Sequence, residues 1–549
     1  MLDLHKIYGS LMKLLILSLL IFVTSLFGFS DDKITMQWLE KQPKSFAKDF
    51  YLWRYLNKNI TAEESNKAIS QVRYLNNKLL YRYINKANDI NLQDYKKCMR
   101  SQTKDLLNKE AYCIEAGLSM FDATKLSSKN LNKIIEKSKN EYPEFTKKLE
   151  IIQSKTPFKT LIEQDKDTFF NTFNECGGKY RVRNFNHYFP AKLFVKLKDD
   201  KKFEQTIKLI VTNLNMRKAQ VSLLKLNPEG LDFKSVFHLA INAIRHKKED
   251  LALVYLEDAF TKAYYQMEKD NILFWQYQLT KNNKYLESLA KSWDVNIYTF
   301  FAKEILKQTH ENIIFNITQN NKELTNYDLS NPFDWLKVLD NSKKMDKEKL
   351  KEYENIFTTT ETLGHLAFVK ERYDRYKKSY FVTPYESYFK NISIHRKSLM
   401  YAIGRQESRF IPTSISSAYA MGTMQIMPFL SRAIAKELKE PYNIFEQFDA
   451  KTNLRYANHH LNYLERKLNH PLYIAYAYNG GIGFTKRLLK TKLFKKGKYE
   501  PYLSMELLPY DETKKYGKKV LANYFVYNNY FNIKDKIKFS TLIDNIENL

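Results

Sequence analysis

Helical periodicity dominates the chain from about residue 41 to residue 380. Val236, Ala240 and Ile244, for example, fall at i, i+4 and i+8 and lie on one face of a helix. Short breaks rich in Asn, Lys and Asp separate the helical segments, and the alternating pattern of strands is rare. Consecutive helix pairs stack into a solenoid because each pair covers its neighbour's apolar face. The pattern predicts a mostly α protein with an N-terminal α-superhelix.

The composition changes near Pro384, where we place the last domain boundary. Seven of the 13 prolines lie at or after Pro384, and seven of the 14 glycines lie after residue 400. The segment 380–384 reads as an extended linker because a residue before proline is disfavoured in a helix. At 549 residues the chain exceeds the roughly 250–300 residues of a single core. We predict four parts: a signal segment 1–30, a superhelical domain 31–330, a helical linker domain 331–384 and an α-rich domain 385–549.

The first 30 residues have the pattern of a signal peptide. Lys13 precedes an uncharged run from Leu14 to Ser30, and Asp31 begins the polar sequence. The run is shorter than the about 20 residues of a membrane span. We therefore expect export with cleavage after Ser30; a retained membrane anchor is the alternative, and Met12 is an alternative start.

The chain has three cysteines, Cys98, Cys113 and Cys176, and the expected export makes a disulfide between two of them plausible. An exported protein can keep a disulfide. We expect Cys98 to pair with Cys113, because their spacing would tie together the ends of two short adjacent helices; three buried thiols are the alternative. No metal-ligand spacing appears, and we expect no metal and no cofactor.

The formal net charge of +28 favours acidic polymers or surfaces as partners. Nucleic acid is the usual inference for a basic chain. Export argues against it, and lysines scattered among Asn, Ile and Tyr form no basic-aromatic RNA motif. We therefore expect no nucleic-acid partner.

Glu407 has the surroundings of a proton-transfer residue. It lies at the end of a helix predicted over 394–408, and residues 408–436 contain no Asp or Glu. The negative end of the helix dipole disfavours its ionised form, and screening by Met424 and Met427 would add to this. A raised pKa suits a general acid near neutral pH. The alternative is an exposed glutamate at a helix end.

Four short motifs follow one another from Glu407 onward. They are Glu407-Ser408, Gly422-Thr-Met-Gln-Ile-Met-Pro428, Ala477-Tyr-Asn-Gly-Gly481 and Leu508-Pro-Tyr-Asp-Glu-Thr-Lys-Lys-Tyr516, with Phe448-Asp-Ala-Lys-Thr-Asn-Leu-Arg455 before the third. In this order they resemble the lytic transglycosylases of the goose-lysozyme-like superfamily, and the last resembles an element of the soluble murein transglycosylases. The chain departs from the family pattern at Thr423 (a leucine there), Tyr419 (commonly glycine), Gly480 (alanine), Ile482 (proline) and Lys514 (arginine).

The resemblance implies a ring-like α-superhelix before a lysozyme-like catalytic domain, and a periplasmic enzyme that acts on peptidoglycan glycan strands. Glu407 would protonate the β-1,4 bond between N-acetylmuramic acid and N-acetylglucosamine. The 2-acetamido group would then capture C1. Glu407 would take the proton from the C6 hydroxyl as a 1,6-anhydro ring closes, so that one residue acts as acid and then as base.

The resemblance also implies substrate-binding roles for other residues: Ser408, Met424, Gln425, Met427, Tyr478, Asn479 and Glu512. Glu512 would bind a peptide stem or orient Tyr478. For Met424 and Met427, core packing is the alternative to lining the floor of a substrate cleft. We expect exolytic action, with the superhelix wrapping the glycan, and cell-wall synthases and the membrane face as further contacts. The other functions considered are a lysozyme-type hydrolase of the same fold and a noncatalytic peptidoglycan-binding scaffold.

Overall fold

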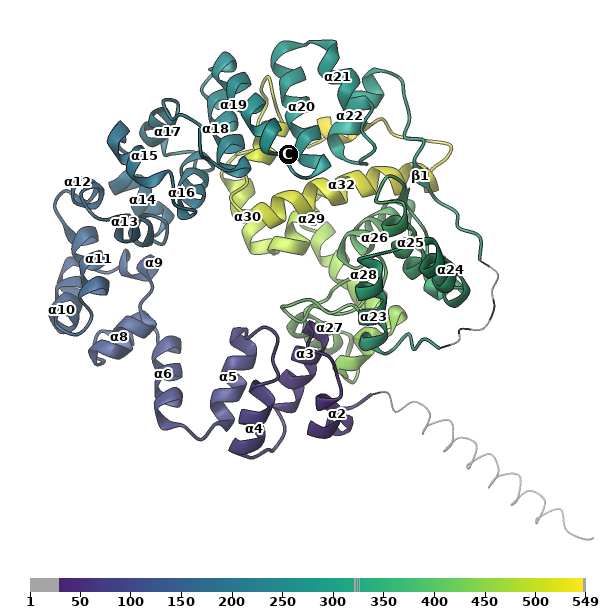
Figure 1. Cartoon of the computed structure of the whole chain (residues 1–549), viewed down its shortest axis with the longest axis horizontal. Coiled ribbons are helices and arrows are strands. Elements are labelled where there is room, and N and C mark those ends of the chain that lie inside the picture. Colours follow the sequence, from purple (N-terminus) through teal and green to yellow (C-terminus); the bar gives the residue numbers. More distant parts are fainter. Residues whose placement is uncertain (1–28, 320–321, 323, 325, 547–549) are drawn as a thin grey trace, which may run out of the picture.

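The computed structural model describes residues 29–319, 322, 324 and 326–546, which form a ring of helices (Figure 1). The prediction of a mostly α fold is confirmed, because the only sheet among these residues has two strands of two residues each. The predicted signal segment lies outside the described residues, apart from Phe29 and Ser30.

The first half of the ring consists of short helices, with these bounds: η1 (Asp31–Lys33), α2 (Met36–Glu40), α3 (Phe46–Tyr55), α4 (Ala62–Ile69), α5 (Asn77–Lys86), α6 (Ile90–Arg100), α7 (Thr103–Leu106), α8 (Ala111–Gly117), α9 (Met120–Ala123), α10 (Ser128–Ser138), α11 (Pro143–Gln153), α12 (Pro157–Ile162), α13 (Lys166–Phe173), α14 (Gly178–Phe185), α15 (Ala191–Leu197), α16 (Lys202–Val211), α17 (Arg217–Leu223), α18 (Phe233–Arg245), α19 (Glu249–Lys262), α20 (Gln266–Thr280), α21 (Asn283–Ala290) and α22 (Ile297–Ile305).

The remaining elements are β1 (Ile313–Ile314), α23 (Pro332–Ser342), α24 (Lys347–Ile356), η2 (Thr360–Thr362), α25 (Leu363–Tyr373), β2 (Ser379–Tyr380), η3 (Glu386–Phe389), α26 (Ile394–Glu407), α27 (Pro428–Leu438), η4 (Ile444–Phe448), α28 (Ala450–Glu465), α29 (Pro471–Gly480), α30 (Ile482–Lys490), α31 (Tyr502–Glu506), α32 (Asp511–Phe531) and α33 (Phe539–Asp544).

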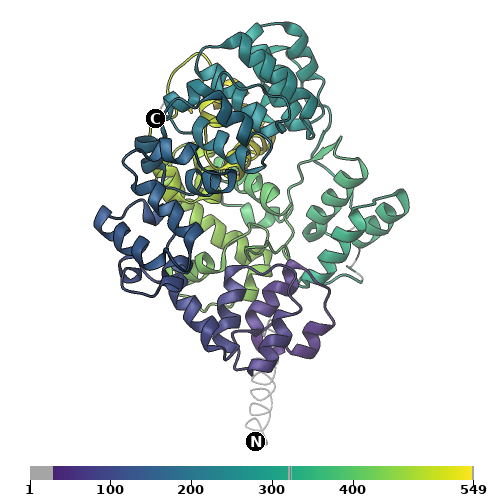
Figure 2. The same ribbon diagram turned by 60° about the vertical axis from the view of Figure 1, so that its left-hand side comes forward.

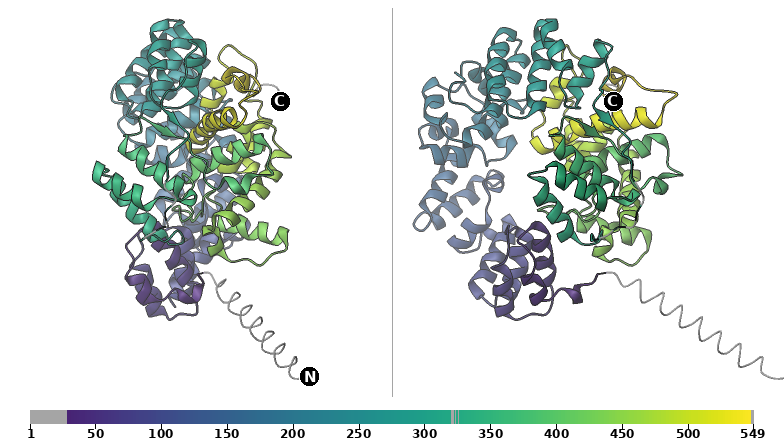
Figure 3. Two further views of the ribbon diagram at one scale, coloured as in Figure 1. Left: turned by 90° about the vertical axis from the view of Figure 1, so that its right-hand side faces the viewer. Right: turned by 45° about the vertical axis from the view of Figure 1, so that its right-hand side comes forward.

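The helices follow a closed path. In Figure 1, α2–α22 run from the bottom along the left side to the top, and α23–α28 return on the right to meet α3 beside α27. The right-hand view in Figure 3 shows the same order around the ring, and Figure 2 shows the superhelix from its outer side. Strands β1 and β2 pair in parallel, Ile313 with Ser379 and Ile314 with Tyr380, and link the end of the superhelix to the segment before α26.

Local sequence explains where the superhelical helices begin and end. The side chain of Asp232 accepts the Ser235 amide at 2.7 Å and caps α18, which is buried on all sides from Ser235 to Ile244. Lys281 ends α20 in the left-handed region (φ 54°), and Asn282 then caps α21. A short break of Lys and Asn, of the kind predicted between the helical segments, therefore separates α20 from α21.

A hydrophobic core closes the ring at its N-terminal end. Phe50 and Tyr51 of α3 share one buried cluster with Phe333 of α23, Tyr419 and Phe445. Tyr51 stacks on Phe333 at 5.7 Å and on Phe445 at 6.0 Å. The first helices therefore bury their apolar faces against the C-terminal third of the chain rather than against one another alone.

Phe29 joins this closing contact. Its ring lies 5.0 Å from Phe445, 5.4 Å from Tyr51 and 5.7 Å from Trp38. Cleavage after Ser30, which remains a prediction, would remove this aromatic side chain from the cluster.

A buried polar network joins the opposite end of the superhelix to the C-terminal helices. Glu506 of α31 accepts the hydroxyl of Tyr298 at 2.8 Å and the amide of Asn271 at 3.0 Å, and it pairs with Lys518 of α32. Burial lowers the pKa of Lys518 to about 8. Burial works against the charge of Glu506, but Lys518 and Lys514 outweigh it and lower the pKa of Glu506. Removing either partner would leave the other charge buried alone.

The apolar cores cross the predicted domain boundaries. One cluster of buried residues extends from α6 through α22 and on into α26–α33. The domain boundaries at 330 and 384 therefore remain predictions, and the parts of the chain on either side of them share hydrophobic cores.

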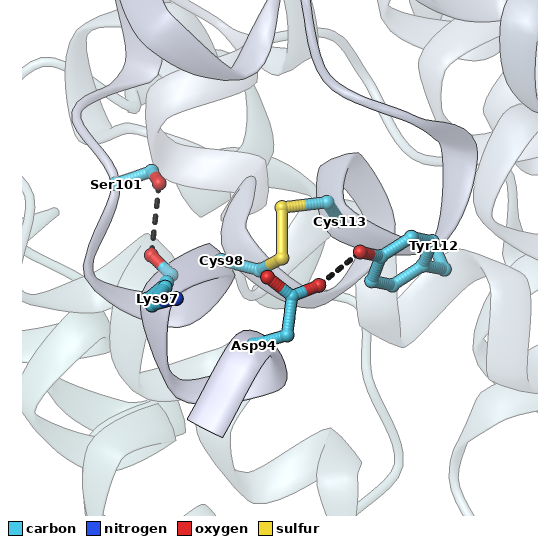
Figure 4. The surroundings of a disulfide bond; sticks show 6 residues. All are labelled: Asp94, Lys97, Cys98, Ser101, Tyr112 and Cys113. Carbon is cyan, nitrogen blue, oxygen red and sulfur yellow. Dashed lines mark hydrogen bonds between the residues drawn. A yellow bond between two sulfur atoms is a disulfide. The ribbon is translucent and has the colours of Figure 1, made fainter. Parts of the chain in front are cut away.

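Cys98 of α6 and Cys113 of α8 form a disulfide with an S–S distance of 2.02 Å (Figure 4). Both are buried, and Tyr112 donates a hydrogen bond to Asp94 beside them. Cys176 is a buried free thiol whose pKa burial raises to about 11. Every helix in the described part of the chain is too short or too polar for a membrane span.

The disulfide gives a first test. Closing a loop with a separation of 15 residues stabilises a protein by about 3 kcal/mol through the entropy of the unfolded chain. The double variant Cys98→Ala/Cys113→Ala should therefore lose about 2–3 kcal/mol in the free energy of unfolding, measured in urea. Reductant should lower the Tm of the wild type and of a Cys176→Ala control but leave the double variant unchanged; equal sensitivity of all three would contradict the disulfide.

Candidate active site

Glu407 is the last residue of α26; its side chain is half-buried, and its carboxyl faces α32. The hydroxyl of Tyr516, on α32, donates to Glu407 Oε1 at 2.7 Å. The two helices pack along their lengths, with Leu399 and Ile403 of α26 and Val520 of α32 fully buried. This packing fixes the position of the carboxyl.

Burial raises the pKa of Glu407 to about 7. The hydrogen bond from Tyr516 opposes the shift, and the nearby charge of Glu512 adds to it. The carboxyl in turn adds to the raised pKa of both Tyr516 and Tyr478, for which burial is the larger cause. The direction of this shift agrees with the expectation from the sequence, and burial is its main cause.

Arg405 does not pair with Glu407. It lies buried on another face of α26, where it donates to Glu371 Oε1 at 2.8 Å and to the Asn523 side chain at 3.1 Å. Its guanidinium also covers the ring of Phe381 at 3.9 Å. These contacts hold the end of α26 in place and leave Glu407 without a basic hydrogen-bond partner in the described residues.

The chain reverses sharply after Glu407. Arg409 and Phe410 both have left-handed backbones, with φ values of 59° and 65°. This conformation is uncommon outside glycine. It folds the Phe410 ring back onto Gly404, where a Cβ atom would lie 2.7 Å from the ring. The reversal therefore requires glycine at 404 and covers α26 with an aromatic ring.

The segment 422–427 forms a tight turn beside Ser408. Gly422 has φ of 82°, and a Cβ atom there would lie 2.3 Å from the Gln447 carbonyl and 2.4 Å from Asn453 Nδ2. The Asn453 side chain accepts the Met424 amide at 2.7 Å and the Thr423 hydroxyl at 3.0 Å. Glycine and asparagine at these positions follow from the close approach of α28 to the turn.

Three predicted binding residues face this turn or belong to it. The Ser408 hydroxyl donates to the Thr423 carbonyl at 2.7 Å and accepts the Ile411 amide at 3.0 Å, so in this structure it connects the helix end to the turn. Gln425, at φ 49°, donates to the Ser414 carbonyl at 3.0 Å. Met424 is fully buried, which favours the core-packing alternative over the cleft floor.

The remaining predicted residues lie on two further helices and at the start of α27. The Tyr478 hydroxyl donates to the Met424 carbonyl at 2.8 Å. Asn479 donates to Glu512 Oε1 at 3.2 Å and accepts the Thr513 hydroxyl. Glu512 therefore contacts Asn479 and not Tyr478. Met427 is half-buried before α27.

Two residues of the site were not assigned by sequence reasoning. Tyr516, the hydrogen-bond partner of Glu407, follows Glu512 by four positions, so both lie on one face of α32. Asn453 holds the turn through its side chain. Both lie inside motifs that the sequence contains, but their roles depend on contacts between distant segments.

A small cavity of about 130 Å³ lies behind the end of α26. Gln406, Arg409, Asp294 and Lys519 are among its lining residues, and Arg409 is paired with Glu371 at 3.2 Å. In the described residues no three His, Cys, Asp or Glu side chains gather as a metal site.

Comparison with known proteins agrees with the motif series. Residues 388–500 match the family described as the Transglycosylase SLT domain. The chain is 28% identical over 281 residues to a protein of Haemophilus influenzae named for a soluble lytic murein transglycosylase, a match that covers 46% of each chain. It is 33% identical over 138 residues to the soluble lytic murein transglycosylase of Escherichia coli, which covers 25% of this chain and 21% of that protein.

These matches confirm the resemblance to soluble lytic murein transglycosylases, and the chain matches less than half the length of these curated relatives. Among solved structures, a lytic transglycosylase of Pseudomonas aeruginosa has 14% identity and a TM-score of 0.48, covering 92% of this chain and 90% of that one. The 70 kDa soluble lytic transglycosylase of E. coli has 16% identity and a TM-score of 0.43, covering 92% and 83%.

The raised pKa of Glu407 predicts a pH dependence of stability. Between pH 4.5 and about 7 the folded carboxyl holds its proton and the unfolded one does not, so stability falls as pH rises through this window. The total loss is at most about 3 kcal/mol. Glu407→Gln removes the ionisable group and with it this loss. The free energy of unfolding in urea should therefore be higher for the variant than for the wild type at pH 7.5, and the difference between the two should be smaller at pH 4.5. A gain that does not change with pH would contradict the shift.

Proposed function

We propose that this chain is a lytic murein transglycosylase that cuts the β-1,4 bond between N-acetylmuramic acid and N-acetylglucosamine and leaves 1,6-anhydro ends. The observation that carries the proposal is the hydrogen bond by which Tyr516 holds the carboxyl of Glu407, a residue inside the segment 388–500 that matches the transglycosylase family; burial raises the pKa of this carboxyl to about 7. Such a carboxyl is protonated often enough near neutral pH to act as a general acid and can then act as a base.

The contacts of Glu407 indicate where its acidic proton lies. Tyr516 donates to Oε1, so this oxygen is an acceptor and Oε2 carries the proton in the neutral acid. In the proposed first step the Oε2 proton moves to the glycosidic oxygen and the C1–O bond breaks. The oxygen of the substrate's 2-acetamido group bonds to C1 and compensates the charge.

In the second step the C6 hydroxyl of the same sugar attacks C1 and displaces the acetamido oxygen. Its proton returns to Glu407, so the enzyme ends in its starting state and no water is consumed. Tyr516 stabilises the carboxylate between the two steps through its hydrogen bond, and burial keeps that carboxylate basic enough to accept the proton.

The position of Glu512 favours this route over hydrolysis. Two-carboxylate glycosidases place a second Asp or Glu across the bond to activate water or attack C1. Glu512 is near enough to affect the pKa of Glu407, but its side chain is exposed and bound to Asn479. A lysozyme-type hydrolase and a noncatalytic scaffold are the other outcomes of the test below.

We also propose that the enzyme works in the periplasm on peptidoglycan, with wall synthases as partners. The family match and the names of the relatives support the substrate. The signal pattern of residues 1–30 and the disulfide support the compartment.

Product analysis tests the reaction. Purified protein incubated with sacculi should release muropeptides with 1,6-anhydro ends, which mass spectrometry distinguishes from hydrolysis products by the mass of one water. Glu407→Gln should lower the rate by at least 10³-fold and still bind sacculi, because the amide keeps the shape but cannot donate the proton. Reducing-end products would indicate a hydrolase, and unchanged turnover by Glu407→Gln would remove this residue from the mechanism.

The exolytic mode remains a proposal, supported by the closed ring of helices, one side of which is formed by the chain's catalytic part (Figure 1). Deleting the superhelix is a poor test, because its first helices share a core with residues 419–448. A time course with the whole protein is better: exolytic action releases disaccharide-peptides from the first minutes without intermediate chains. An early ladder of glycan lengths would show internal cuts.

A further inference from the structure

The turn that supports the active site is connected to the first helices of the ring through one aromatic side chain. Tyr419 is fully buried, and its ring lies 5.4 Å from Trp53 and 5.9 Å from Phe50, both on α3. These residues are separated from Tyr419 by more than 360 positions in the sequence. The contact is therefore made only when the ring is closed.

Tyr419 stands in a conformation that suits glycine. Its φ is 67°, in the left-handed region that side chains other than those of glycine rarely adopt. A residue other than glycine is strained in this backbone conformation, and the family that the chain resembles commonly has glycine at this position. The tyrosine at this position indicates that the packing of its ring on Trp53 and Phe50 offsets the backbone strain.

Residues 415–421 form a short hairpin in which Ile415 and Met421 pair antiparallel, and helix α5 holds this hairpin from its exposed side. Lys78 Nζ donates to the Ala418 carbonyl at 2.7 Å and lies 5.5 Å above the Tyr419 ring. Asn76 donates to the Ser417 carbonyl at 3.1 Å. The tip of the hairpin is therefore bound on one side by aromatic rings of α3 and on the other by polar groups of α5.

A short path leads from this hairpin to Glu407. Met421, buried in the same cluster as Tyr419, exchanges two backbone hydrogen bonds with Ile426, at 3.0 and 2.9 Å. The four residues between them form the turn 422–425. The Thr423 carbonyl in this turn accepts Ser408, next to Glu407, and the Met424 carbonyl accepts Tyr478.

We propose that Tyr419 is a positioning residue through which the N-terminal helices of the closed ring hold the active-site turn in register with Glu407. This inference rests on the proposed function. It assigns to α3 and α5 a part in the reaction at a site to which they contribute no catalytic group.

The test compares steady-state kinetics of full-length variants on purified glycan strands. Tyr419→Gly removes the ring and keeps a residue that tolerates the backbone; kcat should fall at least tenfold with KM within threefold of wild type. Tyr419→Phe keeps the ring, and its kcat should stay within twofold of the wild type.

Trp53→Ala should lower kcat as Tyr419→Gly does. The double variant Trp53→Ala/Tyr419→Gly should have the same kcat as Tyr419→Gly alone, because both substitutions remove the same contact between Trp53 and Tyr419.

Phe194→Ala is the matched control for loss of a buried ring. Phe194 lies on α15, packed against Phe189 and Phe203, and contacts no part of the hairpin. This variant should lower Tm and leave kcat unchanged. If Tyr419→Gly behaves in the same way, with lower Tm and unchanged kcat, Tyr419 is only structural and the proposal fails.

Two measurements keep the test decisive if Tyr419→Gly folds poorly. Lys78→Ala removes a partly exposed contact and should lower kcat two- to fivefold. Hydrogen exchange in the peptide covering residues 421–426 should be at least tenfold faster in Lys78→Ala than in wild type; unchanged exchange and kcat would overturn the proposal. Exchange does not depend on activity, so an inactive wild type would refute the proposed function and leave the positioning role testable.

Discussion

The proposed chemistry depends on the withdrawal of one carboxyl from water. Glu407 is held between α26 and α32 with the hydroxyl of Tyr516 as its hydrogen-bond donor, and burial raises its pKa to about 7. A hydroxyl donor lowers the pKa of a carboxyl less than a buried cation does, so the carboxyl is fixed in position without being forced to ionise. Placing Arg405 in a pair with Glu371 instead keeps that cation away.

The ring and the catalytic part of the chain share their cores at two places. Aromatic residues of α3 pack with Tyr419 and Phe445 at one end, and the network around Glu506 and Lys518 joins α20 and α22 to α32 at the other. The second contact is linked to Glu407 through α32, which carries both Lys518 and Tyr516, and the first is linked to it through Met421 and the turn that Ser408 contacts. The superhelix therefore supports the site from two sides, which a separable binding domain would not do.

Much of this arrangement could be predicted from the sequence. Helical periodicity predicts the α fold, short breaks of Lys and Asn mark helix ends such as Lys281, and the helix predicted over 394–408 places Glu407 at a helix end. Such features depend on residues close together in the chain. The role of Tyr516 was not predicted, and the sequence left core packing of Met424 as one of two alternatives, because each depends on which helices pack together.

The side-chain contacts that close the ring were the least predictable feature of the fold. Nothing local in the sequence of α3 indicates that Phe50 and Trp53 pack on a turn near residue 419, and the charge pattern there is ordinary. The departure of Tyr419 from a family position commonly occupied by glycine was visible, but its meaning requires the position of α3. A departure from a motif can therefore mark a contact particular to one chain.

The most direct test of the account is the protonation state of Glu407 itself. Infrared difference spectra between the wild type and Glu407→Gln, recorded across pH, would isolate the carbonyl stretch of this one protonated carboxyl. We expect the band to be present at pH 6 and to disappear with a midpoint near 7, as the buried environment requires. A midpoint near 4.5, the value of an exposed glutamate, would show that Glu407 is ionised at neutral pH and would contradict its role as the acid.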